Sequence, residues 1–325
     1  MAREKLPSEG RLYKHDNVKF LLITLAVFAH FLELSMTYNR TIMYIIIYSF
    51  HMPVFIFLSG YFASYNPQKI VLNFVVPYFI FQLLYQLFSF TILSPQPLTN
   101  LSIWTFSQPF WLMWYMLALI VWHVLLPFFQ TSSNTAKVCF ILGAFFVSIL
   151  AGFDRNLGYN FSLSRIVVYF PYFLLGHYSR SFTNNKSNVF TGSFSLVMVI
   201  LSIIYIVKNV STLDTTWFYN AVPYNPGTLY GWKFRAGFHF VALSWLSMLM
   251  AFTPNRKIPL VSYIGANTLP VFLLHGFVVK FIGHKFALDL SYANSFVLAG
   301  LAILTVLLLS SKPFSMLFSW KGRRS

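Results

Sequence analysis

The sequence predicts an all-α protein that crosses a membrane with about ten helices, because its charges are few and are spaced like those of a membrane protein. Apolar residues make up 57% of the 325 residues, and charged residues only 9%. A soluble domain carries about 25% charged residues, which it needs for its water-facing surface. We therefore expect most of the surface of this chain to face lipid.

The charged residues divide the chain into apolar segments, each long enough for the roughly 20 residues that a membrane-spanning helix needs. No charged residue occurs between Lys69 and Lys137, and the polar run 94–97 splits that stretch into two helices and a loop. We find no linker and no repeat, so residues 1–325 are expected to form a single membrane-embedded domain, with an N-terminal segment, 1–15, and a C-terminal tail, 312–325. The predicted spans are 18–36, 42–64, 70–93, 109–129, 137–153, 164–180, 188–208, 235–253, 259–283 and 290–311.

The basic residues predict the orientation, since Lys and Arg are enriched in cytoplasmic loops. If the N-terminus is cytoplasmic, most basic residues fall on the inner side, and ten spans then place both termini in the cytoplasm and the chain in the inner membrane. The inner residues are Arg3, Lys5, Arg11, Lys14, Lys69, Lys137, Arg180, Lys186, Arg256, Lys257, Lys312, Lys321, Arg323 and Arg324. The outer residues are Arg40, Arg155, Arg165, Lys208, Lys233, Arg235, Lys280 and Lys285.

Several functional classes do not fit the sequence. The net charge of +16 is spread between apolar runs and does not cluster on one face, so we expect no nucleic-acid partner. The single cysteine, Cys139, cannot form an intramolecular disulfide or a metal site alone. No H-E-x-x-H, C-x-x-C or phosphate-binding P-loop pattern occurs, so we expect neither a metal site nor an ATPase.

The first predicted helix carries three ionisable residues: Lys19, His30 and Glu33. Lys19 and His30 are eleven residues apart, about three helical turns, so they share a face and stand roughly 16 Å apart along the axis. His30 and Glu33 are three residues apart and are therefore neighbours on the helix surface. One stripe thus carries a cation near the cytoplasm and an imidazole–carboxylate pair deeper in the membrane.

This stripe has a chemical interpretation and a structural one. A neutral imidazole can take a proton from an attacking hydroxyl while a carboxylate orients the ring, and a lysine at the cytoplasmic mouth can hold a phosphate. Alternatively, Lys19 reaches to the headgroups and His30 hydrogen-bonds another helix. Glu33 favours the chemical interpretation, because an acid inside the hydrocarbon has few structural roles.

Other candidate residues are individually weaker. His51 is expected just before a kink at Pro53, where free carbonyls and cavities occur. Arg165 stands at the outer rim of a helix and either binds an anion or anchors to headgroups, while His275 lies in a strongly apolar helix where a satisfied buried histidine is commoner. The long segment 209–234, rich in aromatic and amide residues, suits either a sugar or an interfacial cap.

Five motifs, taken together and in order, resemble the acyltransferase-3 superfamily of integral-membrane O-acyltransferases, especially its fucose O-acetylase-like branch that modifies bacterial polysaccharides. The similarity covers about residues 15–310. The matching segments are Lys19 to His30 for a basic residue, a ten-residue gap and a histidine; Phe50 to Tyr61 for F-H-M-P…S-G; Trp114 to Leu119; Arg165 to Gly176 for R…P-F-F-L-L-G; and Gly265 to His275.

The resemblance implies a function and roles for the candidate residues. It implies that acetyl-CoA enters from the cytoplasm and donates its acetyl group to a hydroxyl of a capsule, exopolysaccharide or other envelope glycan, free or lipid-linked, without a metal. The implied catalytic residues are His30 and Glu33, the donor-binding residues are Lys19 and Lys69, and the residues for the acceptor or the oxyanion are Arg165, His51 and His275. The family often has a basic pair before the third helix, whereas this chain has only Lys69, with Asn73 in the second place.

A transporter or flippase for a small metabolite or lipid-linked sugar is the alternative from another class. Buried His, Glu and Lys residues also suit such a protein. Transporters often show repeated halves with broken helices at matching positions. Proline-bearing segments occur at Pro53 and Pro270, but no repeat accompanies them.

Overall fold

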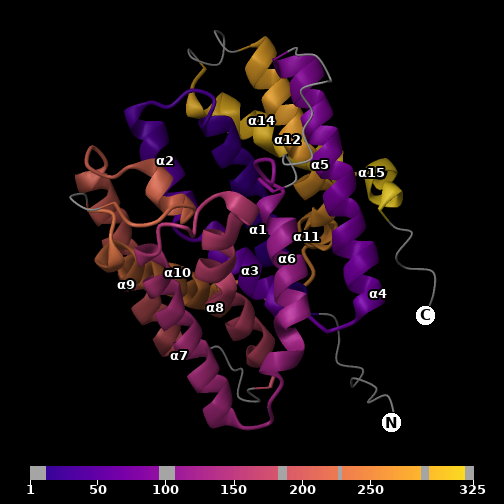
Figure 1. Ribbon diagram of the computed structural model, residues 1–325. Coiled ribbons are helices and arrows are strands. Elements are labelled where there is room, and N and C mark those ends of the chain that lie inside the picture. The colour runs from indigo at the N-terminus through magenta and orange to yellow at the C-terminus, as the bar shows by residue number, and fades with distance from the viewer. Residues whose placement is uncertain (1–11, 95–106, 182–188, 226–228, 287–292, 319–325) are drawn as a thin grey trace.

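The computed structural model describes residues 12–94, 107–181, 189–225, 229–286 and 293–318, in which all regular structure is helical (Figure 1). This confirms the predicted all-α class for the described residues. The helices are α1 (Tyr13–Leu32), α2 (Tyr38–Tyr48), α3 (His51–Tyr61), α4 (Pro67–Ile70), α5 (Val76–Phe88), α6 (Trp114–Leu125), α7 (Asn134–Leu150), α8 (Leu163–Ser179), α9 (Val189–Asn209), α10 (Trp232–Phe252), α11 (Pro259–Ala266), α12 (Thr268–Lys285), α14 (Ser295–Leu309) and α15 (Lys312–Leu317). Short π segments, η1 (Val71–Val75) and η2 (Ser89–Leu93), continue α4 and α5, and 3₁₀ turns occur at η5 (Leu126–Phe129), η6 (Ala151–Phe153), η7 (Asn160–Ser162) and η8 (Thr215–Tyr219).

Within the described residues, six helical segments are long and apolar enough to cross a membrane, and the bent pair α11–α12 makes a seventh if it counts as one span. Two apolar helical segments, Trp114–Phe129 and Ser295–Leu309, are shorter. A helix occupies much of each of the ten predicted spans, but their number and the cytoplasmic position of the termini stay predictions. Residues 1–11 of the predicted N-terminal segment and 319–325 of the predicted tail lie outside the described residues.

The predicted span 42–64 is divided into α2 and α3 by a break between Tyr48 and His51. Pro53 has no backbone N–H, so it cannot bond the carbonyl four residues earlier, that of Ser49, and the helical ladder opens there. We expected His51 just before this kink, and that placement is wrong. His51 is the first residue after the break, where it begins α3.

Two other predicted helices are interrupted. The span 259–283 bends by 79° between α11 and α12, where Asn267 has non-helical backbone angles and Pro270 again lacks an N–H. The span 109–129 becomes helical only at Trp114, because Trp111 adopts a left-handed φ of 36° in the preceding turn. The turn at Trp111 lines the cavity described below, which suits the tolerance of irregular backbone at protected sites inside a membrane.

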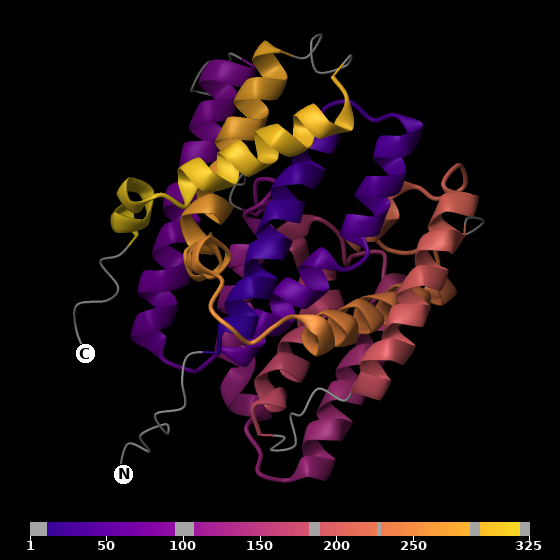
Figure 2. The same ribbon diagram turned by 180° about the vertical axis from the view of Figure 1, so that it is seen from behind.

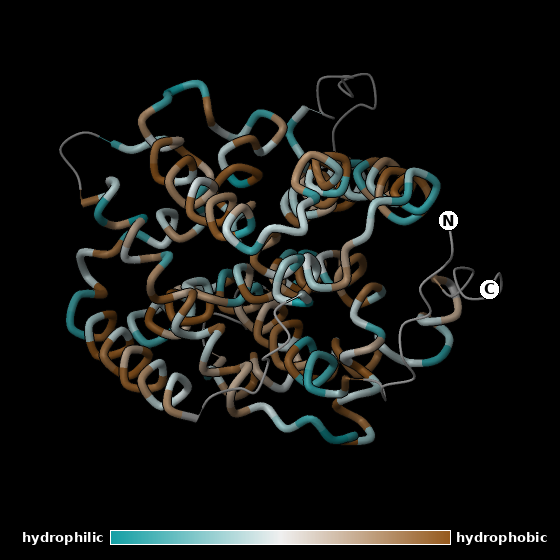
Figure 3. The backbone as a smooth tube through the Cα atoms, turned by 90° about the horizontal axis from the view of Figure 1, so that it is seen from below, coloured by the Kyte–Doolittle hydropathy of each residue, from teal (hydrophilic) through white to brown (hydrophobic). Residues whose placement is uncertain are grey.

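The helices surround α1, which packs against α2, α3, α11, α12 and α14. Seen from behind, α14 crosses obliquely over α1 and α12, and α9 and α10 pack side by side (Figure 2). On the outside, α7 and α9 expose large apolar side chains such as Leu142, Phe146 and Phe194, each more than half exposed. Hydrophobic residues run along the helices, while hydrophilic ones gather mainly in the connections (Figure 3). This distribution fits a bundle whose solvent is lipid.

Small residues allow α3 and α8 to approach closely, as expected for Gly60. A Cβ atom at Gly60 would overlap the carbonyl of Phe173, and a Cβ atom at Gly176 would overlap the carbonyl of Phe57. The two glycines are therefore reciprocal: each accepts the backbone of the opposite helix. Such small-residue contacts are a main source of helix association in lipid.

We predict that Gly60→Ala destabilises the protein by about 1–3 kcal/mol, the usual cost of inserting an extra methyl group into a packed site. Gly143→Ala on α7 is the matched control, because a Cβ atom there meets nothing within 4 Å. Thermal unfolding in detergent should show a lower midpoint for Gly60→Ala and no loss for Gly143→Ala. Equal midpoints for the two variants would contradict the close contact between α3 and α8.

Candidate active site

A cavity of about 350 Å³ lies inside the bundle, between α1, α3, α6, α8 and α12 and the 3₁₀ turn η8. Five of the residues singled out in the sequence line it together: His30, Glu33, His51, Arg165 and His275. They come from four different helices and are up to 245 positions apart in the chain, 275 − 30. Lys19 and Lys69 are not among its lining residues.

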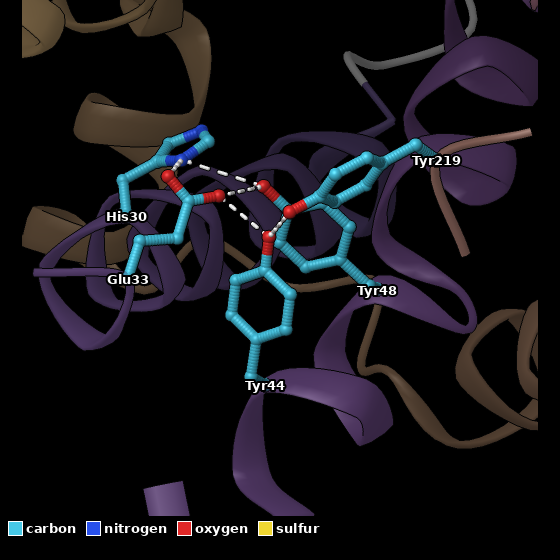
Figure 4. Close-up of polar contacts among 5 residues, drawn as sticks. All are labelled: His30, Glu33, Tyr44, Tyr48 and Tyr219. Carbon is cyan, nitrogen blue, oxygen red and sulfur yellow. Dashed lines mark hydrogen bonds and ion pairs between the residues drawn. The ribbon is translucent and has the colours of Figure 1, made fainter. Parts of the chain in front are cut away.

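The Glu33 carboxylate is the hub of a hydrogen-bond network (Figure 4). Its Oε2 lies 3.4 Å from Nδ1 of His30, the pairing predicted from their spacing on α1. Its Oε1 accepts hydrogen bonds from the hydroxyls of Tyr44, at 2.5 Å, and Tyr48, at 2.8 Å. The Tyr44 hydroxyl also lies 2.8 Å from that of Tyr219. Hydrogen bonds from phenols are what a carboxylate needs when little water reaches it.

The number of O–H and N–H donors in this network determines which atom carries each proton. Each phenol has one O–H, and Tyr44 uses its own on Glu33, so Tyr219 must donate to Tyr44. Burial raises the pKa of Tyr219, which keeps this hydroxyl protonated. Nδ1 of His30 faces the carboxylate and therefore carries the imidazole proton. Nε2 of His30 is left with its lone pair, as a general base requires.

Trp111 forms a second support for His30, and sequence reasoning did not identify it. Its ring meets the His30 ring edge-on with a centroid distance of 4.5 Å, and the Lys280 ammonium lies 4.3 Å from a Trp111 ring centroid. The strained turn that carries Trp111 is held by Gln82, which is fully buried. The Gln82 amide donates to the carbonyl of Gln108 and accepts from the backbone N–H of Phe110. Left-handed backbone at a non-glycine residue often marks a functional site.

The outer wall combines Arg165 with the segment around η8. The Arg165 guanidinium lies 5.1 Å from a Trp114 ring centroid and 5.6 Å from that of Tyr159, and its Nε donates to the carbonyl of Tyr219. Ser164 donates to the carbonyl of Asn220, so α8 fixes the segment that carries Tyr219. The predicted loop 209–234 thus contributes Phe218 and Tyr219 to the lining of the cavity.

His51 and His275 present the same nitrogen to the cavity region. In each, Nδ1 lies 2.7–2.8 Å from the carbonyl four residues earlier in its own helix and so carries the proton. Nε2 of each neutral ring is therefore a hydrogen-bond acceptor. Nε2 of His275 is buried and has no hydrogen-bond partner among the residues that the structure describes, and the His275 ring stacks on His30 at a centroid distance of 5.5 Å. A buried acceptor without a partner is costly and points to a ligand that donates to it.

The predicted donor-binding lysines lie at another level of the bundle, near the turn between α3 and α4. The Lys19 ammonium is 3.8 Å from Asp16 and 4.3 Å from the ring centroid of Phe62, while Lys69 lies in α4. Arg180, which sequence reasoning did not select, joins them, since it donates to the carbonyl of Ala63 in the same turn. Three basic residues from α1, α4 and the end of α8 therefore gather at one mouth of the bundle.

Comparison with known proteins identifies a family. The model of the family described as the acyltransferase domain, acyltransferase-3, matches residues 12–318. Neither a search of curated proteins nor a search of solved structures gave a match. The family predicted from the five motifs is thus confirmed, whereas its fucose O-acetylase-like branch stays a prediction.

We predict that Tyr44→Phe and Tyr48→Phe each destabilise the fold by about 1.5–3 kcal/mol, the worth of a hydrogen bond to a charged group. Each change removes one donor from Glu33, and with it the contact of the Tyr44 hydroxyl with Tyr219 or of the Tyr48 hydroxyl with Nδ1 of His30. In a Glu33→Gln background the same changes should cost clearly less. Free energies of unfolding in detergent measure this coupling.

Tyr263→Phe on α11 is the control, because its exposed hydroxyl lies away from the cavity. A Tyr44→Phe effect as small as that of Tyr263→Phe, or one unchanged by Glu33→Gln, would show that the phenols do not stabilise the carboxylate.

Proposed function

Because the chain belongs to the acyltransferase-3 family and is a multi-pass membrane acyltransferase, we propose that it moves an acetyl group from acetyl-CoA to a hydroxyl of a cell-surface sugar. The observation that carries this proposal is the His30–Glu33 pair, fixed by two phenols beside the cavity. The family match favours transfer over the alternative of a transporter or flippase. We place the protein in the inner membrane, where the donor is cytoplasmic and the acceptor belongs to the envelope.

His30 performs the proton transfer. Its Nε2 removes the proton of the acceptor hydroxyl as that oxygen attacks the thioester carbonyl of acetyl-CoA. The tetrahedral intermediate then collapses, the carbon–sulfur bond breaks, and the CoA thiolate takes the proton back from His30. The products are the acetyl ester and free CoA, with no net gain or loss of protons. Glu33 holds the ring in the productive tautomer and stabilises the imidazolium that forms between the two steps.

The donor enters at the basic mouth. Lys19, Lys69 and Arg180 offer cations from three helices to the phosphates of acetyl-CoA. Lys19 and His30 lie on one face of α1, about 16 Å apart along its axis, so an extended donor can run along this face with its thioester at His30. Arg180 supplies the second cation that Asn73 does not provide.

The acceptor occupies the outer part of the cavity. Arg165 lies between the aromatic rings of Trp114 and Tyr159, an arrangement that suits the polar edge and the apolar face of a sugar ring. The lone pairs on Nε2 of His51 and His275 accept hydrogen bonds from its hydroxyls. Arg165 stabilises the oxyanion or holds the acceptor, since it is the charged donor of this wall.

We predict that His30→Ala lowers acetyl transfer by about 10²–10⁴-fold, the usual contribution of a general base, and that Glu33→Gln causes a smaller loss. The O-acetyl signals of the host envelope glycan, followed by NMR, should vanish in a deletion strain and in the His30→Ala strain. His284→Ala, an exposed histidine at the end of α12, is the matched control and should keep them.

The possible outcomes test the proposed acyl transfer separately from the proposed role of His30 as its base. A deletion that leaves every O-acetyl signal unchanged contradicts the proposed function. If the deletion removes a signal that His30→Ala retains at equal expression, acyl transfer stands and His30 is not its base.

We predict that Arg180→Gln and Lys19→Gln each weaken acetyl-CoA binding about tenfold or more, since each removes a hydrogen bond or ion contact with a phosphate. Calorimetry on purified protein measures the Kd, and the loss should shrink at high salt. Lys257→Gln, an exposed cation in the connection between α10 and α11, is the control. Equal Kd values for wild type and both variants, at unchanged thermal stability, would exclude this mouth as the donor site.

A further inference from the structure

A second cavity, of about 380 Å³, lies between α9 and α10 and has no part in the proton transfer described above. Its lining is mainly apolar, with Ile206 from α9, Phe234 and Phe238 from α10, and Leu213 from the connection between them. Lys233, in the first turn of α10, is the charged residue of this lining. We call this cavity the α9–α10 groove.

The groove adjoins the catalytic cavity. Phe218 lines both, so one side chain forms the wall between them. Ser49 lines the groove at the break between α2 and α3, and His51, two residues later, lines the catalytic cavity. A molecule in the groove is therefore separated from the catalytic cavity by the side chain of Phe218.

The groove is also reached from the lipid. Leu201 and Tyr205 on α9 and Phe240 on α10 expose 52%, 58% and 54% of their surfaces, and these two helices pack side by side on the outside of the bundle (Figure 2). A hydrocarbon chain can enter sideways between such helices without leaving the bilayer. Lys233 is exposed in the first turn of α10, and an ammonium at the end of an apolar helix suits a lipid phosphate.

We propose that the α9–α10 groove holds the hydrocarbon chain of a sugar acceptor that is joined through phosphate to a long lipid, and that Lys233 binds this phosphate. This inference rests on the proposed function and specifies its acceptor as lipid-linked. The chain in the groove and the phosphate at Lys233 bring the attached sugar past Phe218 to Arg165 and His30.

Gly237 gives a sharp test, because it lines the groove and a Cβ atom there meets nothing within 4 Å. Gly237→Leu should fold and fill the groove, and Gly143→Leu, equally open but on α7 and away from the groove, is the matched control. The probe is an undecaprenyl phosphate that carries a diazirine, cross-linked to purified protein in nanodiscs without acetyl-CoA. Excluding two methylene groups is worth about tenfold in affinity. We expect Gly237→Leu to lose about that much labelling, Gly143→Leu to lose none, and labelled peptides to come from α9 and α10.

A second arm examines the phosphate and the lipid class. Lys233→Gln should weaken labelling and Lys233→Arg should restore it. Equal labelling of wild type and Gly237→Leu would overturn the site. If dioleoylphosphatidylglycerol competes as strongly as unlabelled undecaprenyl phosphate, the groove belongs to ordinary phospholipid. That result would overturn the proposal of a lipid-linked acceptor.

The last arm separates this inference from the proposed function. In cells, Gly237→Leu should lower envelope O-acetylation, while purified Gly237→Leu should bind acetyl-CoA like wild type. If the labelling follows the groove but the deletion strain keeps all its O-acetyl groups, acyl transfer to the envelope fails and the lipid site remains. If deletion removes the O-acetyl groups and Gly237→Leu keeps them, the function stands and the groove does not hold the acceptor.

Discussion

A carboxylate inside an apolar bundle must receive hydrogen bonds from the protein, and this requirement at Glu33 determines how the centre of the structure is assembled. Its partners come from α1, through His30, and from α2, through Tyr44 and Tyr48. Through Tyr44, the hydroxyl of Tyr219 links this network to the connection between α9 and α10. Glu33 thus ties α1 to α2 directly and to the distant η8 segment through Tyr44, and the imidazole beside it has little freedom to turn.

The break between α2 and α3 places two residues of the site. Pro53 cannot donate to the carbonyl of Ser49, so the helical hydrogen-bond ladder over 38–61 is interrupted between Tyr48 and His51. Tyr48, the last residue of α2, then meets Glu33, and His51, the first residue of α3, lines the cavity. Pro53 therefore affects the site indirectly. It has no N–H for the Ser49 carbonyl, and the resulting break places Tyr48 and His51 at the ends of two separate helices.

The sequence was sufficient to predict contacts between residues of one helix, but it was insufficient to predict contacts between residues of different helices. His30 and Glu33 could be predicted because a spacing of three residues fixes their neighbourhood on any helix. Tyr44 and Tyr48 could not be selected among 19 tyrosines, although their spacing of four puts them on one face of α2. Trp111 and Arg180 depend on contacts with Gln82 and with the carbonyl of Ala63, and no local pattern encodes such contacts. The apolar segments were predictable from charge spacing alone, and the interruption near Ser49 was predictable from Pro53, whereas the 79° bend at Asn267 was not predicted.

Charge and apolar surface are separated in the structure, which suits the two proposed substrates. Cations lie near the turn between α3 and α4, where we place the phosphates of the proposed donor, while the lining of the α9–α10 groove, where we place the proposed lipid chain, is mainly apolar. Phe218, which lines both the groove and the catalytic cavity, is tied to α8: Tyr169 of α8 donates to its backbone carbonyl, and α8 also carries Arg165. The helix that supplies the charged group of the outer wall thus also fixes the boundary between groove and cavity. Arg165 and His30 therefore keep a constant position relative to each other, because both are set by packed helices and not by a free loop.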